Sequence, residues 1–342
     1  MYSTIKDIAK VAGVSASTVS RFVNDSPLIS EETKIKVRKV MKDMNYTQNI
    51  IAKQLATQNS FNIGFLINSN SKECFMDPFF YEMVGGIQSV VSAKGYELSI
   101  CNINYMEAND NFINKFIRSK KVDGLIIHVS IINKKVVAKL NALDFPYVVI
   151  GQPGESLDVS WVDIDNTKAG EMAVKHLFHE GYRKIAFIGG TSDESVSFNR
   201  RKGYLKALND LNIEINHDYI KESMGTQEDG YSIMKELLHL EMPPDAIIGI
   251  NNYLSFGALT AIKEENKIIA KEVGLVTFDD HPLAPYTSPT LTSLNINIKE
   301  LGVFAGDMLM DLISKKVKGK KATILSPELS VRESSQLTSY KL

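Results

Sequence analysis

The sequence predicts an all-α helix-turn-helix headpiece followed by an α/β core of two lobes with parallel sheets. Three observations lead to this fold class. Residues 1–60 read as short helices around a tight turn, residues 61–290 alternate apolar strands with amphipathic helices, and the charge changes sign between these parts. A chain of 342 residues is also too long for one ordinary core.

The first two helices are predicted on either side of Gly13. Thr4 is placed to cap the first helix, Asp7 lies near its positive end, and apolar residues recur at helical spacing up to position 12. Gly13 interrupts the pattern where a tight turn needs a positive φ. The second helix is expected to begin at Ser15 and to end near Asn24.

The outward face of the second helix has the chemistry of a major-groove contact. Ser and Asn can donate to phosphates and base edges, Arg binds guanine in a bidentate way, and small residues allow close approach. The same pattern also fits an ordinary surface αα-hairpin with polar exposed residues. The candidate DNA contacts in this part of the chain are Thr4, Ser15, Ala16, Ser17, Thr18, Ser20, Arg21, Asn24 and Ser30.

A third helix is predicted after Ser30, with two glutamates in its first turn and basic residues in later turns. Val37, Val40, Met41 and Met44 are expected to complete a three-helix core. Residues 1–60 carry nine Lys or Arg and five Asp or Glu, a net charge of +4, whereas the remaining residues carry −5. A basic headpiece on an acidic body favours duplex DNA as the partner.

Composition argues against several other classes of protein. No stretch approaches the roughly 20 apolar residues of a membrane span, and no cleavable signal peptide is expected before the first helix. Cys74 and Cys101 are far apart and have no Cys/His cluster beside them, so no metal, cofactor or disulfide framework is expected. These features favour the cytoplasm.

The body of the chain reads as two similar α/β runs. Expected strands include IGFLIN, YELSICNIN, DGLIIHVS and YVVIG, then WVDID, KIAFIGG, DAIIGIN and EVGLVTF. Helices are expected over 81–95 and near 107–120, 133–143, 167–180, 199–212, 229–240 and 255–266. Such alternation predicts parallel sheets covered on both faces, with a ligand cleft at the carboxyl ends of the strands.

The motifs together resemble the LacI–GalR family of bacterial transcription repressors, nearly from end to end. They are TIKDIAKVAGVSASTVSR, MNYTQNIIAKQLA, DPFF, VDG, RKGY, NNYLSFGAL, TFDD, SPTLTS and SVRES. The stretches GQPGES and VDIDNTKAG are similar to maltose-operon repressors of low-GC Gram-positive bacteria. The resemblance implies a two-lobed core like that of periplasmic binding proteins, a homodimer, a pseudo-palindromic operator, and a sugar-type effector bound between the lobes. The lobes are expected at 61–157 with 291–319 and at 158–290 with 320–342.

By the same resemblance, residues 49–56 correspond to a hinge helix that orders on the operator and completes the headpiece of residues 1–60. Leu55 would insert into the minor groove as an apolar wedge, beside the small Ala52. Lys53 would contact phosphate, and Asn49 lies in the same segment. The sequence departs from the family here, because Gln48 replaces the usual Pro and Lys53 stands where Arg is commoner. Alternatively, this segment is a solvated linker helix.

Candidate effector contacts follow the strands. Phe79 offers an aromatic face, and Asp165, Arg200, Asn252 and Asp279 offer polar groups for paired hydroxyls. Trp161 is a candidate aromatic platform at the lobe junction. Arg200 matches the family's Arg-x-x-Gly-Tyr pattern, with Arg201 as a rival, and Asn252 replaces the family's more usual Asp.

No catalytic constellation is evident, so the sequence indicates a repressor rather than an enzyme. Its alternatives are a regulator with another sugar, a nucleobase or a phosphoprotein as effector, and a sugar-binding protein or enzyme with a DNA-binding arm. The operator sequence, the effector's identity and the direction of its effect do not follow from the sequence.

Overall fold

The computed structural model describes residues 4–23, 27–46, 53–54, 57–67, 78–103, 112–154, 156–190, 195–316 and 319–337. The chain divides into two compact units, Met1–Ser60 and Phe61–Leu342. Among the helices of the described ranges, none is long and apolar enough to cross a membrane.

The first unit has the predicted helix-turn-helix and third helix. Its helices are α1 (Ile5–Ala12), α2 (Ala16–Val23) and α3 (Glu31–Asp43). One buried cluster unites them, formed by Ile8, Ala9, Ala12, Val19 and Val37, and the expected Val40, Met41 and Met44 pack against it. Within the predicted hinge, the structure describes Lys53 and Gln54, both helical, whereas Asn49, Ala52 and Leu55 lie outside the described residues, as does Asn24.

The first lobe of the second unit is a parallel sheet with the strand order β11-β5-β4-β3-β1-β2. The strands are β1 (Asn62–Ile67), β2 (Glu97–Asn102), β3 (Gly124–His128), β4 (Tyr147–Ile150), β5 (Trp161–Ile164) and β11 (Ala322–Leu325). The helices are α5 (Pro78–Ala93), the π-helix η3 (Ile113–Arg118), the short η4 (Val129–Ile131), α6 (Lys134–Ala142) and α11 (Ile298–Ile313).

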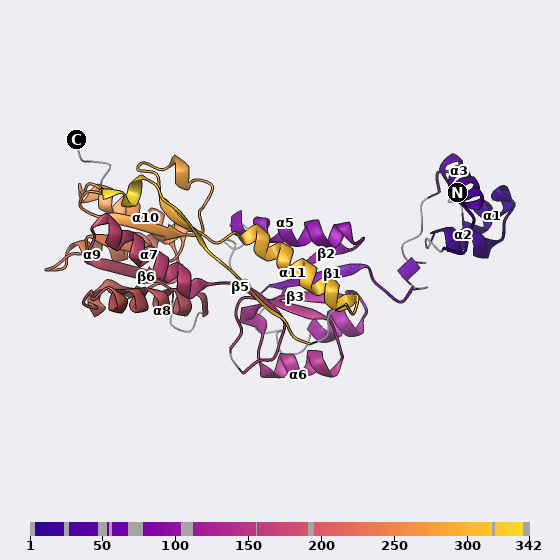
Figure 1. The fold of residues 1–342 in the computed structure, drawn as a ribbon, viewed down its shortest axis with the longest axis horizontal. Helices are drawn as coiled ribbons and strands as arrows, with labels where there is room; N and C mark the ends of the chain where they lie inside the picture. The colour runs from indigo at the N-terminus through magenta and orange to yellow at the C-terminus, as the bar shows by residue number, and fades with distance from the viewer. Residues whose placement is uncertain are drawn as a thin grey trace. The chain divides into compact units, whose positions relative to one another are not determined.

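Both faces of this sheet are covered by helices. Figure 1 shows α5 and α11 on one side of the strands and α6 on the other. Side chains alternate along β1: Phe65 joins the cluster under α5 and α11, whereas Leu66 joins the cluster under α6. This alternation explains why the strands read as continuous apolar runs.

The second lobe is a sheet with the order β12-β10-β9-β8-β6-β7. Its strands are β6 (Ile185–Gly189), β7 (Ile220–Glu222), β8 (Ala246–Gly249), β9 (Gly274–Phe278), β10 (Thr292–Asn295) and β12 (Glu328–Ser330). Its helices are α7 (Asn166–Glu180), α8 (Ser195–Asp210), α9 (Gln227–Leu238) and α10 (Asn252–Glu264), with the short η5 (His217–Tyr219), η6 (Ala284–Tyr286) and η7 (Glu333–Ser335). Helices α7 and α8 pack in one cluster, and α9 and α10 in another.

The structure differs from the predicted elements in three places. The predicted helix at 107–120 is described only at Ile113–Arg118, where it is a π-helix. The short strand β7 was not expected, because its three residues are too few to show a period. Strand β12 runs antiparallel to β10 at the sheet edge, so the second sheet is not purely parallel.

The predicted lobe boundaries are wrong by about one strand. Strand β5 pairs with β4 in the first sheet, so the chain leaves the first lobe after residue 164 rather than 157. Strand β10 pairs with β9 in the second sheet, so the chain returns after 295 rather than 290. Strand β11 pairs with β5, so the last crossing follows 325 rather than 319. Each of these three strands therefore pairs with the sheet of the lobe that the chain is leaving before the chain crosses.

Candidate DNA-binding surface and effector cleft

The start of the headpiece is held by reciprocal capping. The Thr4 backbone N donates to Asp7 Oδ2 at 2.8 Å, and Thr4 Oγ1 accepts from the Asp7 backbone N at 3.4 Å. The Thr4 hydroxyl and backbone lower the pKa of Asp7 by hydrogen bonding to its carboxylate. Gly13 ends α1 in the left-handed region with φ 61°, as the tight turn requires.

The predicted contact face of α2 is available to solvent. Ser15, Ala16, Ser17 and Arg21 are exposed, whereas Val19 is buried against α1 and α3. Thr18 and Ser20 are half-buried. The Ser15 hydroxyl contacts the Ser17 and Thr18 hydroxyls at 2.7 and 2.8 Å.

Two predicted DNA contacts also have a structural role. Thr4 caps α1, and Ser30 Oγ caps α3 by accepting from the Thr33 backbone N at 3.3 Å. Both remain exposed. Sequence reasoning omitted the exposed Lys6 and Lys10 on α1, although their charge suits phosphate.

A cavity of about 280 Å³ lies between the two lobes. The first lobe and its crossover supply Phe79 at the start of α5 and Ile298 at the start of α11, and the second lobe supplies groups that follow β6, β7, β8 and β9. The lining residues are Phe79, Gly190, Val196, Arg200, Met224, Gly225, Ile250, Asn251, Asp279, Ile296 and Ile298. The cavity therefore occupies the position that parallel sheets offer to ligands.

Arg200 is the polar centre of this cleft. It is only 3% exposed, and its guanidinium lies 4.1 Å from the Phe278 ring centroid. Nη1 donates to the Ile250 carbonyl at 2.6 Å, Nη2 donates to Asp279 Oδ1 at 2.9 Å, and Nε donates to Asn166 Oδ1 at 3.0 Å. These bonds fix the plane of the guanidinium while it faces the cavity.

Asp279 has an unusual backbone and environment. Its φ is 72° and that of Asp280 is 23°, both in the region that favours glycine. Such strain is characteristic of functional sites. Burial raises the pKa of Asp279, and the Arg200 guanidinium opposes that rise. Asp280 turns away and pairs with Arg332 Nη1 at 2.6 Å.

An aromatic contact joins the lobes beside the cavity. The His281 ring lies edge-on to Phe79 of the first lobe at 6.4 Å between centroids, and to Phe256 of the second lobe at 5.6 Å. Burial lowers the pKa of His281, which favours its neutral form.

The structure separates the predicted effector residues. Phe79, Arg200 and Asp279 line the cavity. Asp165 does not line it and instead caps α7 by accepting from the Lys168 backbone N at 2.8 Å. Trp161, at the opposite end of β5 from the crossover, packs against the first-lobe core and is not a platform at the junction.

The structure also shows which of two adjacent arginines and which of two adjacent asparagines faces the cavity. Arg201 faces the surface of the second lobe, where it pairs with Glu222 at 3.1 Å. Asn251, not Asn252, lines the cavity, and it also caps α10. Asn252 is buried, and neither of its side-chain polar atoms has a hydrogen-bond partner in the described part of the chain.

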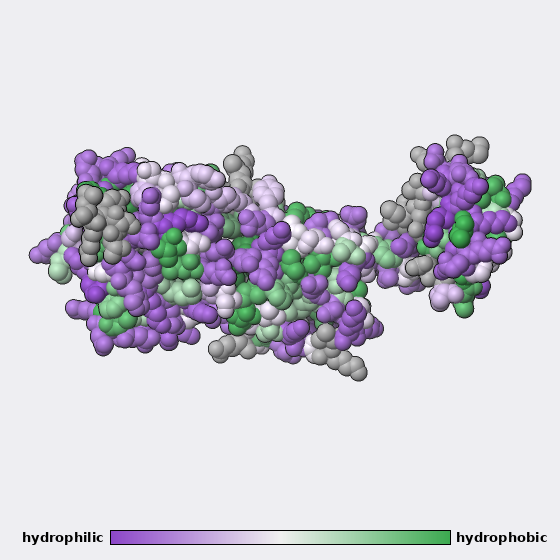
Figure 2. All heavy atoms as spheres, turned by 45° about the horizontal axis from the view of Figure 1, so that its top comes forward, coloured by the Kyte–Doolittle hydropathy of each residue, from purple (hydrophilic) through white to green (hydrophobic). Residues whose placement is uncertain are grey.

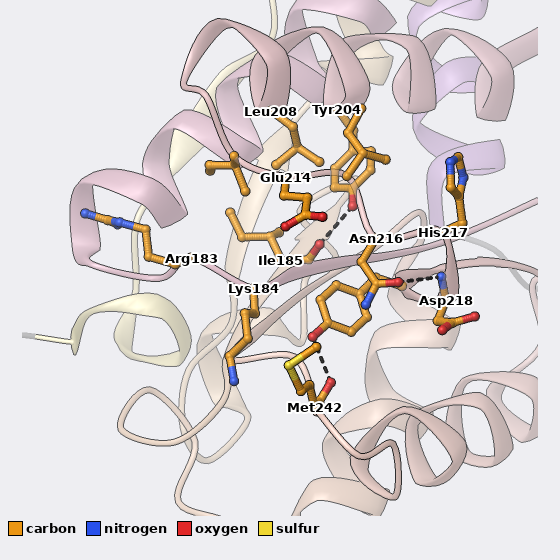
Figure 3. Close-up of a pocket in the computed structure, with 13 residues that line it drawn as sticks. Arg183, Lys184, Ile185, Tyr204, Leu208, Glu214, Asn216, His217, Asp218 and Met242 are labelled. Atoms are coloured by element: carbon orange, nitrogen blue, oxygen red, sulfur yellow. Dashed lines mark hydrogen bonds between the residues drawn. The ribbon is translucent and has the colours of Figure 1, made fainter.

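A second, larger hollow of about 620 Å³ lies at the amino end of β6, away from the cleft (Figure 3). Tyr204 and Tyr219 are among its lining residues, and their hydroxyls donate to the Ile185 and Met242 carbonyls at 2.8 Å. With both hydroxyls already bonded and its charged groups exposed, the hollow lacks the convergent buried groups of the cleft.

Comparison with known proteins matches both units. Residues 4–49 match the model of bacterial regulatory proteins of the lacI family, and residues 60–333 match that of periplasmic binding proteins and the sugar-binding domain of the LacI family. The transcriptional repressor PurR of Histophilus somni strain 2336 is 30% identical over 336 residues, covering 97% of this chain and 98% of that protein.

Solved structures give the same result. A complex of the transcriptional regulator CelR with cellobiose is 26% identical with a TM-score of 0.74, covering 97% of this chain and 99% of that one. The lac repressor dimer bound to operator and an anti-inducer has a TM-score of 0.82 at 24% identity, covering 98% and 99%, and thus supports the fold. The chain belongs to the LacI family of bacterial transcription regulators, which are DNA-binding proteins and not enzymes.

Proposed function

We propose that this regulator is a homodimeric repressor of a sugar-utilisation operon, acting in the cytoplasm, with maltose or a maltodextrin as its effector. Each headpiece reads one half of a pseudo-palindromic operator through the exposed face of α2. The sugar binds in the cleft and changes the lobe arrangement. The buried Arg200–Asp279 pair facing the cavity is the observation that carries the effector assignment.

The charges of the cleft favour an uncharged polyhydroxyl ligand over a phosphorylated one. Among the described lining residues, the charged groups are Arg200 and Asp279, which pair at 2.9 Å and so neutralise each other. A carboxylate and a guanidinium fixed side by side present acceptors and donors to adjacent hydroxyls. A phosphate would compete with Asp279 for an arginine that is already paired.

Relatives support a sugar without fixing which one. A solved relative is described as a cellobiose complex, and another LacI-family regulator, from Enterococcus faecium, carries bound ribose. A nucleobase is an alternative effector that the sequence leaves open. Phe79 is the one aromatic residue among the described lining residues, so a flat base would have one ring to stack on.

A homodimer accounts for exposed apolar groups on the core. Tyr286 is 83% exposed and Leu283 56% exposed, both in the segment after β9. Figure 2 shows green, hydrophobic patches among the hydrophilic surface of the core. Exposed apolar surface of this kind marks interaction sites.

The hinge remains a proposal from the sequence. Leu55, outside the described residues, is expected to wedge the operator centre, so Leu55→Ala should weaken specific binding strongly and leave sugar binding unchanged. Gel-shift titration and calorimetry measure the two effects. Unchanged operator affinity would refute the wedge.

Operator selection from a random DNA library, with and without maltose, tests the whole proposal. We expect a pseudo-palindrome to be enriched and its recovery to change with maltose but not with glucose 6-phosphate. A response to adenine or hypoxanthine instead would establish the nucleobase alternative, and enrichment of no sequence would contradict the repressor assignment.

A further inference from the structure

A continuous chain of hydrogen bonds runs from the effector cleft to the first crossover between the lobes. Asp279 is bound by Arg200 Nη2, and Arg200 Nε donates to Asn166 Oδ1 at 3.0 Å. The other end of the same amide, Asn166 Nδ2, donates to the Ile164 carbonyl at 3.2 Å and to Asp163 Oδ1 at 3.4 Å. Asn166 therefore connects the cleft arginine to β5.

The two ends of this chain belong to different lobes. Asp163 lies in β5 of the first sheet, and its Oδ2 accepts from the Gln152 backbone N beyond β4 at 2.8 Å. Asn166 is the first residue of α7, which packs in the second lobe. Asp165 alone separates β5 from α7, so the Asn166 amide spans the crossover itself.

Burial makes these bonds hard to exchange for water. Asp163, Asn166 and Arg200 are 6%, 4% and 3% exposed. In such surroundings hydrogen bonds are strengthened, and a donor that loses its acceptor is left unpaired. A ligand that shifts Arg200 must therefore either move Asn166 with it or break a buried bond.

We propose that Asn166 is a positioning residue that transmits effector binding from Arg200 to the lobe crossover, an inference that rests on the proposed effector function. The ligand biases the position of Arg200, Asn166 carries that displacement to β5, and the crossover geometry sets the relative orientation of the lobes. This supplies the physical element that a coupling between two sites requires.

Reversing the donor and acceptor tests the link. In Asn166→Asp, the carboxylate still accepts from Arg200 but no longer donates to β5, and it faces the Asp163 carboxylate. The double variant Asp163→Asn with Asn166→Asp restores a donor–acceptor pair and the original net charge. Asn209→Asp, on the exposed surface of α8, controls for the added charge.

The assay measures affinity for the selected operator with and without maltose. Allosteric coupling is typically about 5–150-fold. In Asn166→Asp, we expect maltose to change operator affinity by less than about twofold, while the affinity without maltose stays within about threefold of wild type. We expect the double variant to regain most of the maltose effect. Trp161, the sole tryptophan, reports on β5 through its fluorescence.

The outcomes distinguish a role of Asn166 in coupling from a purely structural role. The proposal is supported if Asn166→Asp still binds maltose but maltose changes neither its Trp161 fluorescence nor its operator affinity. The double variant must then regain the effect of maltose on operator affinity. An unchanged maltose effect on operator affinity in Asn166→Asp overturns the proposal. So does a double variant that binds maltose and has the Tm of wild type but shows no maltose effect on operator affinity. A wild-type protein that binds neither maltose, cellobiose nor ribose contradicts the proposed effector and the relay with it.

Discussion

Replacing Arg200 with alanine should reveal how strongly the cleft depends on one buried ion pair. The change removes three hydrogen bonds and leaves Asp279 buried without its counter-charge. Removing one partner of a buried pair costs about 3–5 kcal/mol. For a domain of this size that corresponds to a fall in Tm of roughly 6–20 °C.

The adjacent arginine provides a matched control. Arg201 pairs with Glu222, but the side chains are 25% and 47% exposed. Solvent screens such a pair, and its loss should cost at most about 1 kcal/mol. The same substitution one residue apart therefore separates burial of charge from removal of charge.

The penalty in Arg200→Ala should depend on pH with a defined sign. Burial already raises the pKa of Asp279, and loss of the guanidinium removes the main influence that lowers it. When the pKa of a carboxyl is higher in the folded than in the unfolded protein, its charge destabilises the fold. This penalty is complete at pH values above the folded pKa and vanishes below the unfolded pKa of about 3.9. The difference in Tm from wild type should therefore shrink as the pH falls from about 8 toward 4.

Thermal unfolding of wild type, Arg200→Ala and Arg201→Ala across pH, with maltose titrated at neutral pH, measures all of this. We expect Arg200→Ala to lose the maltose response and Arg201→Ala to retain it. Equal destabilisation of the two variants, or a penalty in Arg200→Ala that grows toward low pH, would refute the reasoning.

Three further outcomes are expected. Thr4→Ala should destabilise the headpiece by about 1 kcal/mol, measurable by thermal unfolding of the full chain with circular dichroism, because the α1 cap is lost. Gly203→Ala should cost about 1–3 kcal/mol or more in urea unfolding, since its methyl group would overlap the Thr167 carbonyl of α7; an unchanged midpoint would contradict this packing. Asn252→Leu should leave the ligand-free core as stable as wild type or more so, because both amide atoms lack partners among the described residues; destabilisation beyond about 1 kcal/mol would show that the amide is bonded.

Periodicity predicted the architecture because its physical basis is local. The headpiece helices follow from caps and spacing around Gly13, and the core strands follow from apolar runs buried on both faces. The lobe boundaries did not follow in the same way. Strand β5 reads equally well as the end of one α/β unit or the start of the next, and its pairing with β4 and β11 is a long-range choice.

The residues that line the cleft were hard to predict because they lie at junctions between a strand and a helix. In VDIDN, two carboxylates two residues apart are both plausible ligands, and the chain turns from strand to helix between them. Asp163 remains in the sheet and accepts from the Gln152 backbone, whereas Asp165 becomes a helix cap. Asn251 and Asn252 exchange roles for the same reason, since the helix cap falls on the first. A shift of one residue at such a junction changes the direction of a side chain completely.

The choice between Arg200 and Arg201 also needed the structure, because the helical spacing fits both residues. Arg200 stands three and four residues before Gly203 and Tyr204, which pack α8 against its own lobe, and seven before the buried Ala207. Arg201 stands at the same intervals before Tyr204, Leu205 and Leu208, so the spacing alone would place either arginine on the buried side of α8. A guanidinium placed there needs a buried acceptor, and Asp279 with the Ile250 carbonyl supplies it. These acceptors stand 50 and 79 residues further along the chain, so tertiary contacts select Arg200, whereas Arg201 pairs with Glu222 at the surface.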